Sequence, residues 1–224
     1  KPAAVVNRLR GSHHLAPTAA HCASVGAMLA RMHLAGSDYS RVQPNLRGLP
    51  WWQQTVPVVL PHLNDDQRAL ITSELAHQQD VAASAAYGQL PRGPIHGDLF
   101  RDNVMFEGER LTGLFDFYFA GIDTLLFDIG VCLNDWCVDQ HDGRLAEDRA
   151  HALVAAYDAI RPLGSAELRL LPALQRAGAL RFWVSRLWDL HLPRDASMLQ
   201  PHDPTHFERV LRQRIDTPWH FVRG

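Results

Sequence analysis

One stretch of the sequence gathers polar side chains that could take part in a reaction. It begins at Ile95 and reads IHGDLFRDNVMFEGERLTGLFDFYFAGIDTLLFD. Asp98, Asn103 and Asp116 offer two carboxylates and a carboxamide, all of them oxygen donors. Such a set suits a hard cation like Mg²⁺, which keeps several waters and shares protein oxygens with phosphates. Phosphoryl transfer to a hydroxyl needs one carboxylate to orient the hydroxyl and accept its proton, while other oxygens hold the metal.

This chemistry assigns a role to each polar residue of the run. We expect Asp98 to be the base, and Asn103 and Asp116 to hold the metal. His96 is expected to bond to the backbone and hold the loop, with Asp128 supporting it from the following helix. Any one of these residues alone is more often a turn or cap residue. The joint pattern, HxDxxxxN followed by a hairpin and an aspartate, favours the chemical interpretation.

A hairpin is the element that would position these residues. Residues 104–106 and 111–115 are apolar and strand-like, and the polar stretch 107–110 between them is typical of a turn. Asn103 lies just before the first strand and Asp116 just after the second. Because an antiparallel pair returns the chain, both should lie at the same end of the ribbon.

Helical patterns surround this hairpin. On its N-terminal side, Thr18 is expected to cap a helix that ends at Gly36, and an Asn64–Gln67 capping box opens another that runs to Gly88. The buried stripe of that second helix is expected to be apolar. Residues 3–9 read as a strand, and 38–63 as an irregular connection with room for one short helix.

On the C-terminal side, four more helices are expected. Asp123 would cap the first, and residues 145–160 mark the second. The third covers 174–187 with Pro172 in its first turn, and Asp203-Pro204 starts the last. The sequence therefore predicts a mainly α fold with a small β-hairpin.

Composition excludes several classes of protein. The 224 residues carry a net charge of −2, which does not indicate a nucleic-acid or anionic-membrane surface. The most apolar stretch, 111–133, is interrupted by three aspartates, each costing roughly 3 kcal/mol near a bilayer centre. Three cysteines without a CxxC pair predict a reduced, cytoplasmic protein, and no histidine or cysteine spacing favours zinc. No signal peptide opens the sequence.

HGDLFRDN followed by LFDF resembles the catalytic and metal-binding loops of the aminoglycoside-phosphotransferase and choline-kinase superfamily. Within it, HGDLFRDNVMF, GLFDFYFAG, FDIGVCLNDWC and KPAAVVNRLRGSHHLAPTAAHCASVGAMLARMH are similar to bacterial homoserine kinases. Phe100 stands where antibiotic kinases usually carry histidine, although it could simply pack under the loop. The resemblance implies ATP and Mg²⁺, the catalytic candidates Asp98, His96 and Arg101, and the metal ligands Asn103 and Asp116.

The resemblance also implies a division of the chain. It identifies the chain with the C-terminal lobe of a protein-kinase-like α+β fold. Residues 1–10 would be the last strand of the N-terminal lobe and the hinge, and 11–224 the helical lobe. Val6, Asn7 and Arg8 would then lie along the adenine. Most of the N-terminal lobe would be absent, so these residues alone are expected to be inactive, and the exposed interlobe face leaves self-association open.

The substrate implied is an amino alcohol, L-homoserine, phosphorylated in threonine biosynthesis. Its carboxylate would need an arginine. Arg181 and Arg186 are available on a late helix, although a solvated helix face is their commoner role. An aminoglycoside or choline-type kinase, a non-catalytic kinase-like binding module and a metal-dependent hydrolase remain as alternatives.

Overall fold

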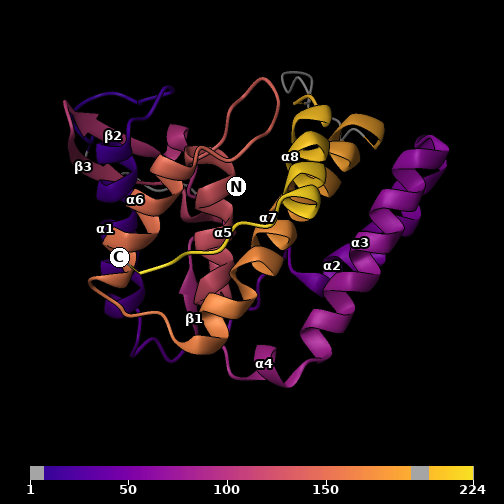
Figure 1. Cartoon of the computed structure of the whole chain (residues 1–224), viewed down its shortest axis with the longest axis horizontal. Helices are drawn as coiled ribbons and strands as arrows, with labels where there is room; N and C mark the ends of the chain where they lie inside the picture. The colour runs from indigo at the N-terminus through magenta and orange to yellow at the C-terminus, as the bar shows by residue number, and fades with distance from the viewer. Residues whose placement is uncertain (1–7, 193–201, 224) are drawn as a thin grey trace.

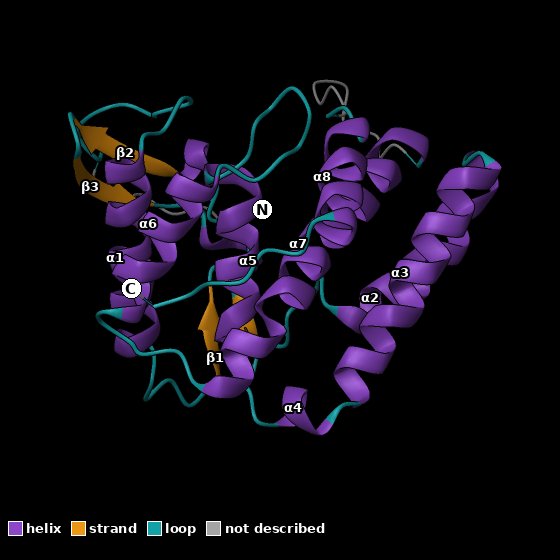
Figure 2. Cartoon of the chain, in the orientation of Figure 1, coloured by secondary structure: helices purple, strands orange, loops and turns teal. Residues whose placement is uncertain are grey.

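The computed structural model describes residues 8–192 and 202–223. Helices dominate it, with short strands between them (Figures 1 and 2). The helices are α1 (Ala19–Ala35), α2 (Leu49–Val59), α3 (Asp65–Ala83), α4 (Ala85–Gly88), α5 (Leu125–Trp136), α6 (Glu147–Asp158), α7 (Ser165–His191) and α8 (Thr205–Asp216). The strands are β1 (Arg92–Ile95), β2 (Val104–Glu107), β3 (Arg110–Leu114) and β4 (Gly121–Thr124). Single 3₁₀ turns are η1 (Leu60–His62), η2 (Arg101–Asn103) and η3 (Phe117–Phe119).

The predicted hairpin is present as β2 and β3, so the mainly α fold with a small hairpin is confirmed. Val104 pairs with Leu114, and Glu107 with Arg110, around a turn in which Gly108 has a φ of 59°. Phe115 N–H donates to the Asn103 carbonyl at 3.1 Å, which extends the pairing past the strand ends. The residues before β2 and after β3 are thereby held side by side.

A second ribbon, β1 with β4, was not predicted. Arg92 pairs with Thr124, and Ile95 with Gly121. Pro91 and Pro94 count against a regular strand at this position. A two-stranded ribbon has only edge strands, however, and proline is tolerated there. This ribbon places the start of β1 beside the start of α5, and the start of the 96–98 loop beside Gly121.

The core forms around α5 and α7. Every residue of α5 is buried. Helix α5 packs on α7, α1 packs on α6, and α7 also contacts α2, α3 and α8 (Figure 1). Helix α7 therefore links the part of the molecule that carries the hairpin to the α2–α3 pair.

Several helix boundaries agree with the sequence and several do not. Thr18 caps α1 and Gly36 ends it, and the Asn64–Gln67 capping box opens α3. Helix α3 stops at Ala83, however, and the separate short α4 reaches Gly88. The connection 38–63 holds the 11-residue helix α2.

Other expectations for the helices were wrong. The buried residues of α3 are Ile71, Glu74 and Gln78, so the buried face of this helix is partly polar. Glu74 can be buried because it pairs with Arg176 of α7. Pro172 lies in the interior of α7 and not in its first turn. Within the described ranges, no helix is long and apolar enough to cross a membrane.

Candidate active site

The loop that follows β1 is held by one buried carboxylate. The backbone N–H groups of His96 and Gly97 donate to the two oxygens of Asp128, each at 2.7 Å. Gly97 has a φ of +74°, and a Cβ there would lie 3.0 Å from the Phe119 carbonyl. Only glycine fits this turn without strain, and the turn places Asp98 immediately after the anchored residues.

Asp128 is itself supported from two other helices. His33 of α1 lies 3.2 Å from its carboxylate, and the other ring nitrogen of His33 lies 2.7 Å from the Tyr157 hydroxyl of α6. Burial alone would raise the pKa of Asp128, but His33, His96 and the Gly97 N–H outweigh burial and lower it. Asp128 is therefore an ionised anchor for the loop.

His96 joins this loop to the end of the hairpin. Its Nε2 lies 2.9 Å from the Phe115 carbonyl, and its ring packs on Phe117. Its Nδ1 is buried and has no hydrogen-bond partner in the described ranges. These contacts are to backbone and to a ring, with no bond to Asp98.

Asp98 faces an arginine that the sequence analysis assigned to a solvated helix face, and that assignment was wrong. Arg181 of α7 is only 3% exposed, and its NH1 lies 3.8 Å from Asp98 Oδ1. Its guanidinium lies 3.7 Å from the ring centroid of Phe182 and 4.8 Å from that of Phe119. Two aromatic faces thus hold the guanidinium beside the carboxylate.

The charges of this pair are shifted by burial. Burial raises the pKa of Asp98 to about 6, although Arg181 pulls it down. Burial lowers the pKa of Arg181 to about 10, which leaves it a cation at neutral pH. Its Nε and NH2 have no hydrogen-bond partner in the described ranges. The pair is a weakly coupled carboxylate and cation in a largely desolvated site.

Asn103 and Asp116 lie at the same end of the hairpin, where the Phe115 N–H donates to the Asn103 carbonyl. The Asn103 Nδ2 donates to the Asp98 carbonyl at 2.8 Å, and no described residue donates a hydrogen bond to its amide oxygen. Asp116 is exposed, has a left-handed backbone with φ 64°, and accepts from the Tyr118 N–H at 3.4 Å. One free amide oxygen and one carboxylate fit a hard cation that takes its other ligands from phosphates and water. Among the described residues, no group of three or more His, Cys, Asp or Glu could hold a metal ion by itself.

Arg101 does not face Asp98. Its guanidinium forms a two-point pair with Asp135 of α5 at 3.1 and 3.2 Å, and its NH1 donates to the Leu15 carbonyl at 2.6 Å. Its backbone N–H also donates to Asp135 at 2.8 Å. Burial raises the pKa of Asp135 despite this pairing. These contacts fasten the loop to α5 and engage the Arg101 guanidinium through all three of its nitrogens.

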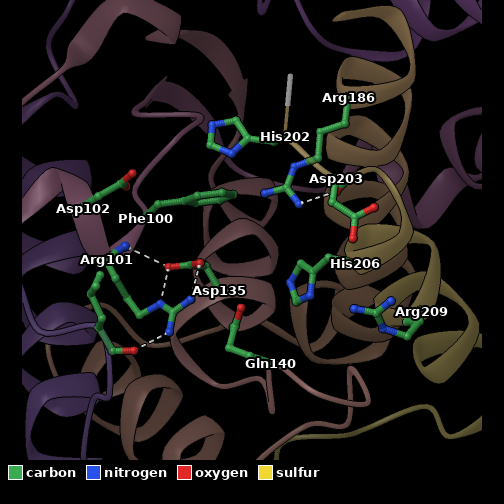
Figure 3. Close-up of a pocket in the computed structure, with 11 residues that line it drawn as sticks. Phe100, Arg101, Asp102, Asp135, Gln140, Arg186, His202, Asp203, His206 and Arg209 are labelled. Carbon is green, nitrogen blue, oxygen red and sulfur yellow. Dashed lines mark hydrogen bonds and ion pairs between the residues drawn. The ribbon is translucent and has the colours of Figure 1, made fainter. Parts of the chain in front are cut away.

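A cavity of about 380 Å³ adjoins this loop (Figure 3). Phe100, Arg101 and Asp102 line one side of it, and residues of α7 and α8 line the other. Phe100 stacks on Phe182 and Phe207, with ring centroids 4.4 and 6.0 Å away. Phe100 therefore packs beneath the loop and forms part of the cavity wall as well.

The expected adenine contacts fall at the edge of the described chain. Val6 and Asn7 lie outside the described residues, and so does most of the expected strand 3–9. Arg8 is exposed and has no regular secondary structure. Of the described residues, Ser12 is the first whose backbone pairs with a hairpin strand, through two hydrogen bonds to Phe106 at 2.9 Å.

Sequence reasoning missed several residues of this site. Arg181 was named only as a candidate for the substrate carboxylate, and its burial beside Asp98 was not predicted. Its burial had a signal, because it interrupts the apolar helical run 180–184. His33 and Tyr157 lie on apolar helix faces and read as ordinary core residues. Arg209 and His206 of the cavity lie on α8, whose sequence pattern is that of any amphipathic helix.

Comparison with known proteins gives a consistent result. Residues 1–163 match the model of the phosphotransferase enzyme family. A homoserine kinase from Polaromonas naphthalenivorans is 68% identical over 98% of this chain and 69% of its own length. A homoserine kinase from Cupriavidus taiwanensis is 61% identical over 96% of this chain and 66% of its own length. The chain thus spans about two thirds of the length of these relatives.

Solved structures with the same fold are more distant in sequence. An amicoumacin kinase in complex with AMP-PNP, Ca²⁺ and amicoumacin has a TM-score of 0.62 at 14% identity, covering 92% of this chain and 61% of its own. A choline/ethanolamine kinase family protein from Mesorhizobium loti has a TM-score of 0.63 at 18% identity, covering 88% and 63%. At these identities the likeness shows the protein-kinase-like fold alone.

Proposed function

The chain belongs to the phosphotransferase enzyme family, on the branch of the homoserine kinases, and we propose that it transfers a phosphoryl group from ATP to the hydroxyl of L-homoserine. On this proposal the reaction serves threonine biosynthesis in the cytoplasm. The observation that carries the proposal is geometric. Asp98 lies on an anchored loop beside a buried arginine, and its carbonyl holds the amide of Asn103.

Each residue has a role that its surroundings support. Asp98 Oδ accepts a hydrogen bond from the acceptor hydroxyl and takes its proton as the oxygen attacks the transferred phosphorus. Arg181 supplies positive charge next to Asp98 and keeps this buried carboxylate oriented. His96 and Asp128 hold the loop through the backbone. We assign Arg101 to positioning the loop through Asp135 and not to the chemical step.

Asn103 and Asp116 would hold Mg²⁺ through the free amide oxygen and the exposed carboxylate. When bound, the ion would neutralise the phosphate oxygens of the nucleotide. Hydrogen bonds to Asp98 and Phe115 fix the position of Asn103 and therefore of its amide oxygen. Val6, Asn7 and Arg8 remain our candidates for the nucleotide edge.

An acceptor panel tests this proposal. ADP release from Mg²⁺-ATP would be measured on the full-length chain that carries this sequence, with homoserine, choline and an aminoglycoside in parallel. We expect release with homoserine and little with the other two. ADP release with choline or an aminoglycoside, and none with homoserine, would identify that acceptor as the substrate in place of homoserine. Release that depends on water and not on an acceptor would mark a hydrolase, and none at all would leave a binding module.

A further inference from the structure

The cavity beside the catalytic loop has two chemically different walls. The wall formed by the loop and the end of α5 carries acids, Asp102 and Asp135, with Arg101 tied to the latter. The opposite wall comes from α7, α8 and the residues just before α8, and it carries Arg186, His206 and Arg209 (Figure 3). Asp203 lies on this wall too, with its carboxylate accepting hydrogen bonds from the Thr205 N–H at 2.9 Å and the Thr205 hydroxyl at 2.7 Å. The cavity is thus polarised across its width.

Arg186 is half-buried and has no acidic partner. Its NH1 donates to the Asp203 carbonyl at 3.1 Å, and its guanidinium lies 4.4 Å from the Phe207 ring centroid. Burial lowers its pKa, and the nearby acids only partly offset that effect. Among the residues that the structure describes, it forms no ion pair.

Arg209 is a second cation on the same wall. Its NH1 donates to the Thr205 hydroxyl at 3.0 Å, while its Nε is buried without a hydrogen-bond partner in the described ranges. His206, between the two arginines, has a pKa lowered to about 4 by burial and by Arg186 and Arg209. The imidazole is therefore neutral, and the positive charge of the wall belongs to the arginines. Two half-desolvated guanidinium groups that face one cavity favour an anion between them.

The loop wall complements them. Asp102 is exposed and makes no hydrogen bond or ion pair among the residues described, in contrast to Asp135. A small zwitterion can therefore place its carboxylate on the arginines and its ammonium towards Asp102. The third group of such a ligand, a hydroxyl, must reach Asp98. Asp98 is not itself a lining residue, but it lies two residues before Phe100 on the loop that forms this wall.

We propose that this cavity is the receptor for the α-carboxylate of the acceptor, bound by Arg186 and Arg209, so that the enzyme selects amino acids over amino alcohols that have no carboxylate. The assignment rests on the proposed function and names the part of the site that sets its specificity. Arg181, which is clamped between two rings at Asp98, serves the transfer step and is separate from this carboxylate subsite.

A pair of acceptors that differ only in the carboxylate tests the subsite. 3-Amino-1-propanol is homoserine without its carboxylate. In the full-length chain, we expect Arg186→Gln and Arg209→Gln each to lower kcat/KM for homoserine roughly 10-fold, and the double variant about 100-fold. The loss should appear mainly in KM, and kcat/KM for 3-amino-1-propanol should change by less than about 3-fold. The matched control is Arg212→Gln, which removes an arginine of α8 that pairs with Asp66 and Glu208 and does not line the cavity.

The outcomes separate this inference from the proposed function. Equal losses with both acceptors, or an unchanged KM for homoserine, would overturn the carboxylate subsite while leaving the kinase in place. If the unaltered protein phosphorylates no homoserine, the proposed function itself fails. Calorimetric titration with L-homoserine in the absence of nucleotide gives an independent readout. Heat of binding that is lost in the double variant and kept in Arg212→Gln supports the subsite, and equal heat in all three contradicts it.

Discussion

At the scale of single residues, the site depends on a largely buried carboxylate beside a buried cation. Asp98 is 19% exposed at its side chain, so water screens it little. Arg181 is the nearest cation, and its position is fixed by aromatic rings and not by hydrogen bonds. An arginine held in this way can orient a neighbouring base without competing for its oxygens.

Replacement of Arg181 tests that role. We expect Arg181→Met to lower kcat at least 10-fold with a smaller change in the KM for homoserine, because the charge next to Asp98 is lost while the cavity cations remain. Arg181→Lys should recover part of kcat, since it restores charge without the planar guanidinium. Steady-state kinetics would be measured beside urea unfolding of each variant. A raised KM for homoserine, with kcat unchanged, would place Arg181 in substrate binding instead.

Asp116 supports a second prediction at this scale. Asp116→Asn should raise the Mg²⁺ concentration that gives half-maximal rate by about 10-fold, because one of the two proposed oxygen ligands loses its charge. A Mg²⁺ titration at fixed ATP would measure it. Asp123→Asn is the control, since Asp123 lies nearby in sequence but pairs with Arg92 and Asn45. Equal titration curves for Asp116→Asn and the unaltered protein would refute the assignment.

At the scale of elements, Asp128 connects three of them. Its carboxylate joins the 96–98 loop to α5, and His33 with Tyr157 extends the contact to α1 and α6. Asp128→Asn keeps the shape of the side chain but replaces one acceptor oxygen by an NH2 group. One backbone N–H of the loop then faces a donor and loses its hydrogen bond. We expect the free energy of unfolding at pH 7 to fall by about 2–4 kcal/mol, as for loss of a buried charged hydrogen-bond partner. Urea unfolding monitored by tryptophan fluorescence would check this.

The same residue gives a pH dependence. The pKa of Asp128 is lower in the folded protein than its unfolded value of about 3.9. Its stabilisation is therefore complete above about pH 4 and is lost as the pH falls through the folded value. Unfolding free energy should fall less steeply below pH 4 in Asp128→Asn than in the unaltered protein. Parallel curves for the two proteins would show that this carboxylate does not titrate with folding.

Elements whose turns or caps are encoded by neighbouring residues could be predicted from the sequence. The turn 107–110 and the apolar runs beside it were enough to predict β2 and β3, and the Asn64–Gln67 capping box was enough for the start of α3. Ribbon β1–β4 pairs residues about thirty positions apart, Arg92 with Thr124, and its short strands contain no such signal. Pairing between distant segments is decided by tertiary packing, which a single sequence does not display.

The site followed the same division. The motif predicted which residues converge, because the hairpin fixes Asn103 and Asp116 relative to each other. It could not predict that α7 would bring Arg181 to Asp98, or that Arg101 would be occupied by Asp135. Those pairings link segments that are far apart in sequence, and burial of α5 and α7 determines them.

At the scale of the whole molecule, these residues correspond to about two thirds of each curated relative. Positioning of the phosphates accounts for most of the catalysis of phosphoryl transfer. We therefore expect the 224 residues alone to turn over homoserine at least 100-fold more slowly than the full-length chain that carries them. Equal rates would show that these residues suffice. Self-association through the interlobe face stays a prediction, which sedimentation velocity of the 224-residue chain would test.

Replacement of Asp98 tests whether it is the base for phosphoryl transfer to homoserine. Phosphohomoserine formation would be followed by mass spectrometry for the full-length protein and for its Asp98→Asn variant, at saturating ATP, Mg²⁺ and homoserine. We expect the unaltered protein to form phosphohomoserine, and Asp98→Asn to form it at least about 100-fold more slowly while it still binds ATP. Product formed at a similar rate by Asp98→Asn would contradict the account.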